Sequence, residues 1–167
     1  MALRHTNPKG GSGMIRINTR VLIDRPAAEV FDYVADFENA PEWQAGVVKS
    51  GKVTEGPIMV GTKFEEDVRI VFRKARTVCM VTDLNTGKSL AFAATSKPVD
   101  YQGTFTFEQT PRGTLLTLEA NCEMNGAWKL LEPLMSLDAK SGVKKELGRI
   151  KKALESRRAA TRRAVRA

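Results

Sequence analysis

The chain of 167 residues is long enough for one domain with a full core, since 42% of its residues are hydrophobic. Its formal net charge of +8 comes entirely from residues 144–167, which hold ten Lys and Arg against two Glu, so the rest of the chain is electrically balanced. A balanced body argues against a nucleic-acid-binding domain, and because no apolar run reaches the ~20 residues of a membrane span, we expect a cytoplasmic protein.

The chain starts with a polar, glycine-rich segment, residues 1–13, which lacks the apolar centre of a secretory signal. We expect it to be a mobile lead-in or a remnant of cloning. Residues 14–24 are rich in β-branched side chains and predict a first strand. Pro26 suits the first turn of a helix, and residues 27–35 carry an apolar stripe at helical spacing, with Tyr33 expected on the opposite face.

A second short helix is predicted over residues 36–43, because Asp36 and Asn39 are good caps and Pro41 fits a first helical turn. Six strand-like runs follow, bounded by Gly, Pro or Asn. They cover residues 47–55, 62–72, 75–84, 88–96, 101–110 and 114–124. Strands joined by short turns pair antiparallel, so the pattern predicts a meander of seven strands in all.

The alternation of apolar and polar residues decides the buried face for only some of these strands. It is clearest in residues 101–110 and 114–124. In residues 75–84 the face that includes Cys79 and the face that includes Met80 are both apolar enough to lie inside.

A long final helix is predicted from about residue 127 to residue 156, with a break in regularity at Pro133 and Gly142. Its apolar stripe consists of Trp128, Leu131, Leu134 or Met135, Val143, Leu147, Ile150 and Leu154. Beyond it, residues 157–167 form a basic tail, which we interpret as a solvated extension of the helix. The expected domain therefore covers residues 14–156.

Five short stretches carry a resemblance to a known family. They are RPAAEVFDYVAD at 25–36, PEW at 41–43, GTKF at 61–64, GTLL at 113–116 and ELGRIKKALE at 146–155. In this order they resemble the polyketide cyclase/dehydrase and lipid-transport proteins of the START-like (SRPBCC) superfamily, which includes the plant pollen allergens of the Bet v type. The resemblance covers about residues 14–156, and its motifs are turns, caps and core positions, which are specific for fold rather than function.

The resemblance implies an α+β helix-grip fold. In that fold, a curved antiparallel sheet of seven strands wraps around a long C-terminal helix, with two short helices after the first strand and a cavity between sheet and helix. The expected function is binding of a hydrophobic small molecule such as a polyketide, lipid or isoprenoid, with transport as an extension of that role. The first alternative is an enzyme of the cyclase/dehydrase type, and the second is an interaction module that acts through the basic tail.

Candidate ligand-binding residues are apolar or aromatic and are expected to face this cavity. They are Trp43, Phe64, Val68, Ile70, Met80, Phe92, Tyr101, Phe105, Met124, Trp128, Leu131 and Met135. Each of them has a plain alternative role in the hydrophobic core. For Trp43, the resemblance favours a place at the cavity entrance.

Four residues are weak candidates for catalysis. Glu66 shares a strand face with apolar residues, so it would lie inside with a raised pKa unless it reaches water at the strand end. Arg69 and Arg76 are expected on the outer face, and would bind or polarise a carbonyl only if they pointed inward. Tyr101 would supply a phenol, as is thought of some cyclase relatives.

The sequence predicts neither a metal nor another cofactor. His5 is the only histidine and lies in the lead-in, and Cys79 and Cys122 form no Cys-x-x-Cys pair. We expect both cysteines to be free thiols, although a disulfide is the alternative. The expected partner is a small apolar ligand, with no specific nucleic acid and at most peripheral membrane contact through the tail; the protein itself is expected to be a monomer or a homodimer.

Overall fold

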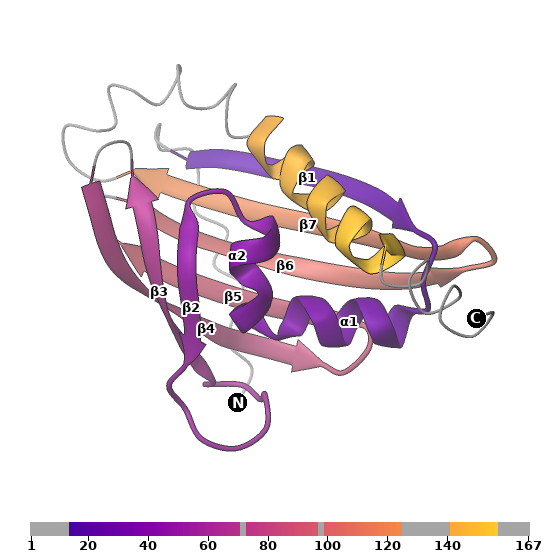
Figure 1. Ribbon diagram of the computed structural model, residues 1–167, viewed down its shortest axis with the longest axis horizontal. Coiled ribbons are helices and arrows are strands. Elements are labelled where there is room, and N and C mark those ends of the chain that lie inside the picture. The colour runs from indigo at the N-terminus through magenta and orange to yellow at the C-terminus, as the bar shows by residue number, and fades with distance from the viewer. Residues whose placement is uncertain (1–13, 71–72, 97–98, 125–140, 157–167) are drawn as a thin grey trace, which may run out of the picture.

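The protein is an α+β domain of two layers (Figure 1). The computed structural model describes residues 14–70, 73–96, 99–124 and 141–156. One layer is a curved antiparallel sheet, and the helices of the other layer lie together on one face of that sheet. The predicted helix-grip fold is confirmed. The lead-in, the expected start of the last helix and the basic tail lie outside the described residues.

The described residues contain seven strands, which form one sheet in the order β1-β7-β6-β5-β4-β3-β2. Their bounds are β1 Met14–Ile23, β2 Val47–Lys52, β3 Lys63–Ile70, β4 Arg73–Asn85, β5 Ser89–Ser96, β6 Val99–Thr110 and β7 Gly113–Met124. From β2 to β7 each strand pairs antiparallel with the next, which is the predicted meander. Strand β1 pairs with β7, so β1 and β2 are the edges of the sheet.

The connection from β1 to β2 folds back over the sheet as three short helices. These are α1 (Ala27–Ala35), the single 3-10 turn η1 (Phe37–Asn39) and α2 (Ala40–Trp43). Val30, Phe31 and Val34 of α1 are buried as the stripe predicts. The prediction for Tyr33 was wrong: its ring is buried, and its hydroxyl donates a hydrogen bond to Glu42 Oε2 at 2.8 Å, which satisfies the one polar group of an otherwise apolar side chain.

The two predicted caps behave differently. The Asp36 carboxylate accepts a hydrogen bond from the Glu38 amide at 3.1 Å, so Asp36 caps η1 as expected. Asn39 makes no side-chain cap; its amide donates to the Tyr33 carbonyl oxygen at 3.0 Å. Asn39 therefore binds η1 and α2 back onto the end of α1, and this bond holds the helical segment compact over the sheet.

The C-terminal helix, residues 141–156, lies across the sheet on the same face as α1 and α2 (Figure 1). The predicted stripe is confirmed for its described part, in which Val143, Leu147, Ile150 and Leu154 are buried. Polar contacts fix the far end of this helix: Lys151 Nζ donates to the Leu22 carbonyl oxygen at 2.7 Å, and the Asp24 amide donates to Glu155 Oε1 at 2.9 Å.

A glycine closes the β6–β7 hairpin against the end of β1. Gly113 has a φ of +118°, and a Cβ there would lie 2.1 Å from the Ile23 carbonyl oxygen. Only glycine fits so close an approach. The next residue, Thr114, is fully buried and donates its hydroxyl to the Arg25 carbonyl oxygen at 2.7 Å, so this turn joins sheet and helical layer.

Candidate functional site

The inner face of the sheet is lined by a cluster of aromatic rings under the helical layer. Phe37 of η1 is at its centre: its ring centroid lies 5.4 Å from that of Phe64 and 5.4 Å from that of Phe92. Trp43 of α2 contacts Phe37 at 6.5 Å and Phe105 at 6.1 Å. These distances are typical of edge-to-face and tilted aromatic pairs, so this part of the interior is filled by side chains.

The register of β4 shows which of its two faces is buried, a question that the sequence left open. Thr77, Cys79 and Val81 are buried, whereas Val78 is exposed. Met80 is therefore on the outer face and pairs there with Lys63, which is exposed. Because neighbouring residues of a strand point to opposite sides, burial of Cys79 excludes Met80 from the inner wall, and we remove Met80 from the candidate site.

Glu66 of β3 is buried on the inner face, with 4% of its surface exposed. Its Oε1 atom has no hydrogen-bond partner among the described residues. Burial raises the pKa of this carboxyl from 4.5 to about 7. The alternative, that Glu66 reaches water at the strand end, is wrong, because almost none of its surface is exposed.

Tyr101 of β6 is partly buried and packs against the core beside the aromatic cluster. Its ring is 5.5 Å from Phe92. Burial, and then the charge of Glu146 on the C-terminal helix, raise the pKa of the Tyr101 hydroxyl above its usual value. The phenol therefore stays protonated at neutral pH and is available as a hydrogen-bond donor.

Glu146 on the C-terminal helix is a second carboxyl with a raised pKa; it is half-buried, and the sequence analysis missed it. Its Oε1 accepts a hydrogen bond from the Ala45 amide at 2.8 Å, just after α2. Burial raises the pKa of Glu146 to about 7, although the Ala45 amide and Arg149 oppose the rise. One signal was present in the sequence: Glu146 follows Val143 by three residues and precedes Ile150 by four, so it lies beside the buried stripe.

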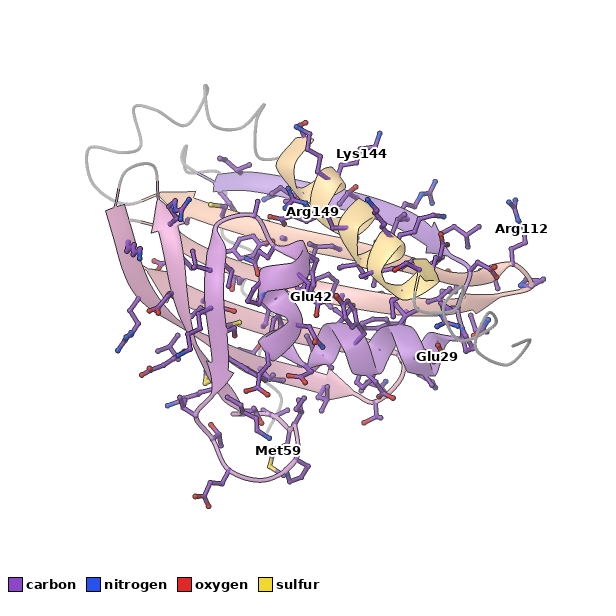
Figure 2. All side chains as sticks on the ribbon, viewed as in Figure 1. Glu29, Glu42, Met59, Arg112, Lys144 and Arg149 are labelled. Atoms are coloured by element: carbon purple, nitrogen blue, oxygen red, sulfur yellow. The ribbon has the colours of Figure 1, made fainter. Side chains whose placement is uncertain are left out.

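A further bond joins the C-terminal helix to α2. Arg149 Nη1 donates to the Trp43 carbonyl oxygen at 3.4 Å, and Figure 2 shows Arg149 on the side of the helix that faces α2. The indole Nε1 of Trp43 itself is buried without a hydrogen-bond partner among the described residues. These two bonds join the end of α2 to the C-terminal helix, next to an unsatisfied donor.

The remaining predicted site residues fall into three groups. Val68 is partly buried and packs against the core. Arg69 and Arg76 are exposed on the outer face, as expected, and Arg76 forms ion pairs with Asp67 at 3.3 Å and with Glu65 at 4.0 Å. The side chains of Ile70 and Met124, and all of Trp128, Leu131 and Met135, lie outside the described part of the chain.

Cys79 and Cys122 are free thiols. Cys122 pairs with Tyr101, Tyr101 with Ala94 and Ala94 with Cys79, so three strand spacings separate the two cysteines. Within the described residues, no group of three His, Cys, Asp or Glu side chains is arranged to hold a metal ion. Nor does any helix in that part of the chain have the length and apolar character needed to cross a membrane.

The comparisons with known proteins agree with this geometry. A family model described as polyketide cyclase / dehydrase and lipid transport matches residues 14–155. None of the curated protein sequences is significantly similar to the chain.

Solved structures share the fold at low sequence identity. The Zhui aromatase/cyclase from Streptomyces sp. R1128 superposes with a TM-score of 0.70 at 17% identity, over 86% of this chain and 95% of that one. Ara h 8.0201 superposes with a TM-score of 0.66 at 13% identity, over 86% and 99%. The di-domain ARO/CYC StfQ of the steffimycin biosynthetic pathway gives 0.68 at 15% identity over 89% of this chain, which spans only 53% of that protein.

Proposed function

The chain belongs to the polyketide cyclase / dehydrase and lipid transport family, and on this premise we propose that it binds a hydrophobic small molecule between the inner face of the sheet and the C-terminal helix. A polyketide, a lipid or an isoprenoid fits this description. Transport of such a molecule through the cytoplasm, by a monomer or a homodimer, is part of the same proposal.

One observation carries the proposal: the apolar interior contains buried polar atoms that nothing in the described chain satisfies. They are Glu66 Oε1, Ser50 Oγ and Trp43 Nε1. A buried polar atom without a partner costs about 1–3 kcal/mol, so each of these three atoms calls for a partner, such as a ligand group or a bound water molecule. An apolar wall with a few convergent polar groups is the usual make-up of a small-molecule site.

The first experiment is native mass spectrometry of the protein purified from its own cells, compared with the denatured mass. We expect a non-covalent adduct whose mass begins to identify the ligand. A matched pair of variants locates it: Ala94→Phe places a ring on the inner face of β5, between Cys79 and Tyr101, and Ala93→Phe places one on the outer face. The adduct should disappear in Ala94→Phe and remain in Ala93→Phe. Equal adducts in both variants would contradict the proposed location.

The raised pKa values of two carboxyl groups support a second candidate function, a cyclase- or dehydratase-type enzyme. Glu66 on β3 and Glu146 on the C-terminal helix have pKa values of about 7, so each can give or take a proton near neutral pH. Such groups suit proton transfer next to a ketone, as in aldol cyclisation followed by loss of water. Tyr101 would donate a hydrogen bond to the carbonyl oxygen.

Turnover of a poly-ketone by the purified protein tests this second function. We expect Glu66→Gln and Tyr101→Phe to reduce kcat while the variants stay folded. If both variants keep the wild-type rate, neither residue is the acid or base.

The third function, an interaction module, depends on residues 157–167, and deleting them should leave co-sedimentation with ribosomes and with anionic vesicles unchanged.

A further inference from the structure

A row of polar side chains crosses the inner face at the β2 edge of the sheet. Glu66 of β3 is directly opposite Ser50 of β2 on one side and Thr77 of β4 on the other. Residues paired in this way point to the same face, so all three belong to the inner wall. Glu66 and Thr77 are buried, with 4% and 5% of their surface exposed, and the Ser50 hydroxyl oxygen is fully buried.

Two atoms of this row need a partner that the described chain does not provide. Ser50 Oγ and Glu66 Oε1 are both without one. Their Cβ atoms are about 5 Å apart, as in any directly opposed antiparallel pair, so one small group between them can contact both oxygens. The apolar surroundings, which include the fully buried Phe64 two residues before Glu66, strengthen any hydrogen bond formed there.

We propose that Ser50 and Glu66 form a subsite for a hydroxyl group at one end of an otherwise apolar ligand. The proposal rests on the proposed function and narrows it to alcohols, phenols or enols. A hydroxyl is both donor and acceptor: it donates to the Glu66 carboxylate while it accepts from the Ser50 hydroxyl, or the roles exchange when Glu66 is protonated. The apolar remainder of the ligand then lies against the inner face of the sheet, toward the C-terminal helix.

Other end groups fit this pair less well. A ligand carboxylate would place a second acid beside Glu66 in apolar surroundings, where two like charges repel strongly. A methyl group would leave both oxygens without partners. An ammonium group would require Glu66 to be ionised and would bury a charge pair, whose loss of hydration offsets much of its attraction.

The test compares three naphthalene probes that carry a hydroxyl, a methyl or a carboxylate group at the same ring position. Binding is measured by isothermal titration calorimetry with the full chain. The wild-type protein should bind the hydroxyl probe about tenfold more tightly than the methyl probe, the equivalent of one net hydrogen bond, and the carboxylate probe most weakly.

Ser50→Ala and Glu66→Leu should each reduce the preference for hydroxyl over methyl to within about twofold, without weakening the methyl probe. Glu65→Leu, one residue away on the outer face, is the matched control and should keep the full preference. Ser50→Ala removes a single oxygen, so it tests the subsite even if Glu66→Leu does not fold.

The results separate this proposal from the proposed function. If the hydroxyl and methyl probes bind the wild-type protein equally, or if the preference survives in both Ser50→Ala and Glu66→Leu, the subsite is wrong and the apolar container stands. If none of the probes binds, the container and the subsite both fail.

Discussion

Two regions of the same inner face differ sharply in how well their side chains are satisfied. Under η1 and α2, Phe37 is 1% exposed and has three aromatic neighbours, so nearly all of its apolar surface is packed against other side chains. Toward the β2 edge, Ser50 and Glu66 are buried with oxygen atoms that lack partners. The first region has the features of a stabilising core. The second has those of a binding site, in which unpaired polar atoms lower the stability of the fold.

The difference shows why burial alone does not identify a binding site. Phe64 and Glu66 are two residues apart on one strand, and both are buried. The ring gains from enclosure, whereas the carboxyl loses its hydration, which is why the pKa of Glu66 rises to about 7. Substitutions in the two regions are therefore expected to change the free energy of unfolding in opposite directions.

The largest effect is expected in the aromatic region. Phe37→Ala removes the ring that contacts Trp43, Phe64 and Phe92, and should lower the free energy of unfolding by about 3–5 kcal/mol. Urea unfolding measures it. Met59→Ala, on the exposed loop that projects away from the sheet (Figure 2), is the control and should change stability little. A loss below about 1 kcal/mol for Phe37→Ala would show that this region is not tightly packed.

The second effect concerns pH and Glu66. Because burial raises the folded-state pKa of Glu66 from 4.5 to about 7, the folded protein holds its proton more tightly than the unfolded chain. Stability should therefore fall as the pH rises from 4.5 to about 7, by an amount of the order of 3 kcal/mol from this group.

Glu146 contributes with the same sign, because its pKa is also raised to about 7. The measurement is therefore a difference: urea unfolding across this range for wild type, Glu66→Gln and the outer-face control Glu65→Gln. Glu66→Gln should show a distinctly smaller fall than the other two. Identical pH profiles for all three proteins would mean that Glu66 is hydrated.

A smaller effect is expected where the C-terminal helix meets α2. Glu146→Ala removes the acceptor of the Ala45 amide, which should cost about 1–2 kcal/mol, less whatever is regained by removing a half-buried carboxyl. Hydrogen exchange at the Ala45 amide is the direct readout and should become faster. Lys145→Ala, at an exposed neighbouring position, should leave that exchange rate unchanged.

The smallest effect belongs to the outer face. Arg76 is 68% exposed in its ion pairs with Asp67 and Glu65, and pairs in water contribute little. Arg76→Ala should change the free energy of unfolding by at most about 0.5 kcal/mol and leave binding of the apolar probes unaffected. A clear loss of probe affinity would return Arg76 to the list of site residues.

The order of the elements could be predicted without the structure, because that order depends on local chemistry. Alternation and the Gly and Pro breakers predict each strand to within a few residues, and the apolar stripe predicts α1. The motifs from Arg25 to Asp36 carried the family resemblance. The strand pattern placed Glu66 on the same face as Phe64, but it left open whether the carboxyl reaches water, and the fold shows that it is buried.

Features that depend on partners far along the chain emerged only from the folded structure. Only pairing of β4 with both neighbours shows that Cys79 faces inward and Met80 outward, since either face was apolar enough. Ser50 gains its place opposite Glu66 through the β2–β3 register, and Glu146 joins the site because a helix about one hundred residues away packs on α2. Burial and hydrogen-bond satisfaction are properties of the assembled fold, so no local pattern could reveal which polar atoms lack partners.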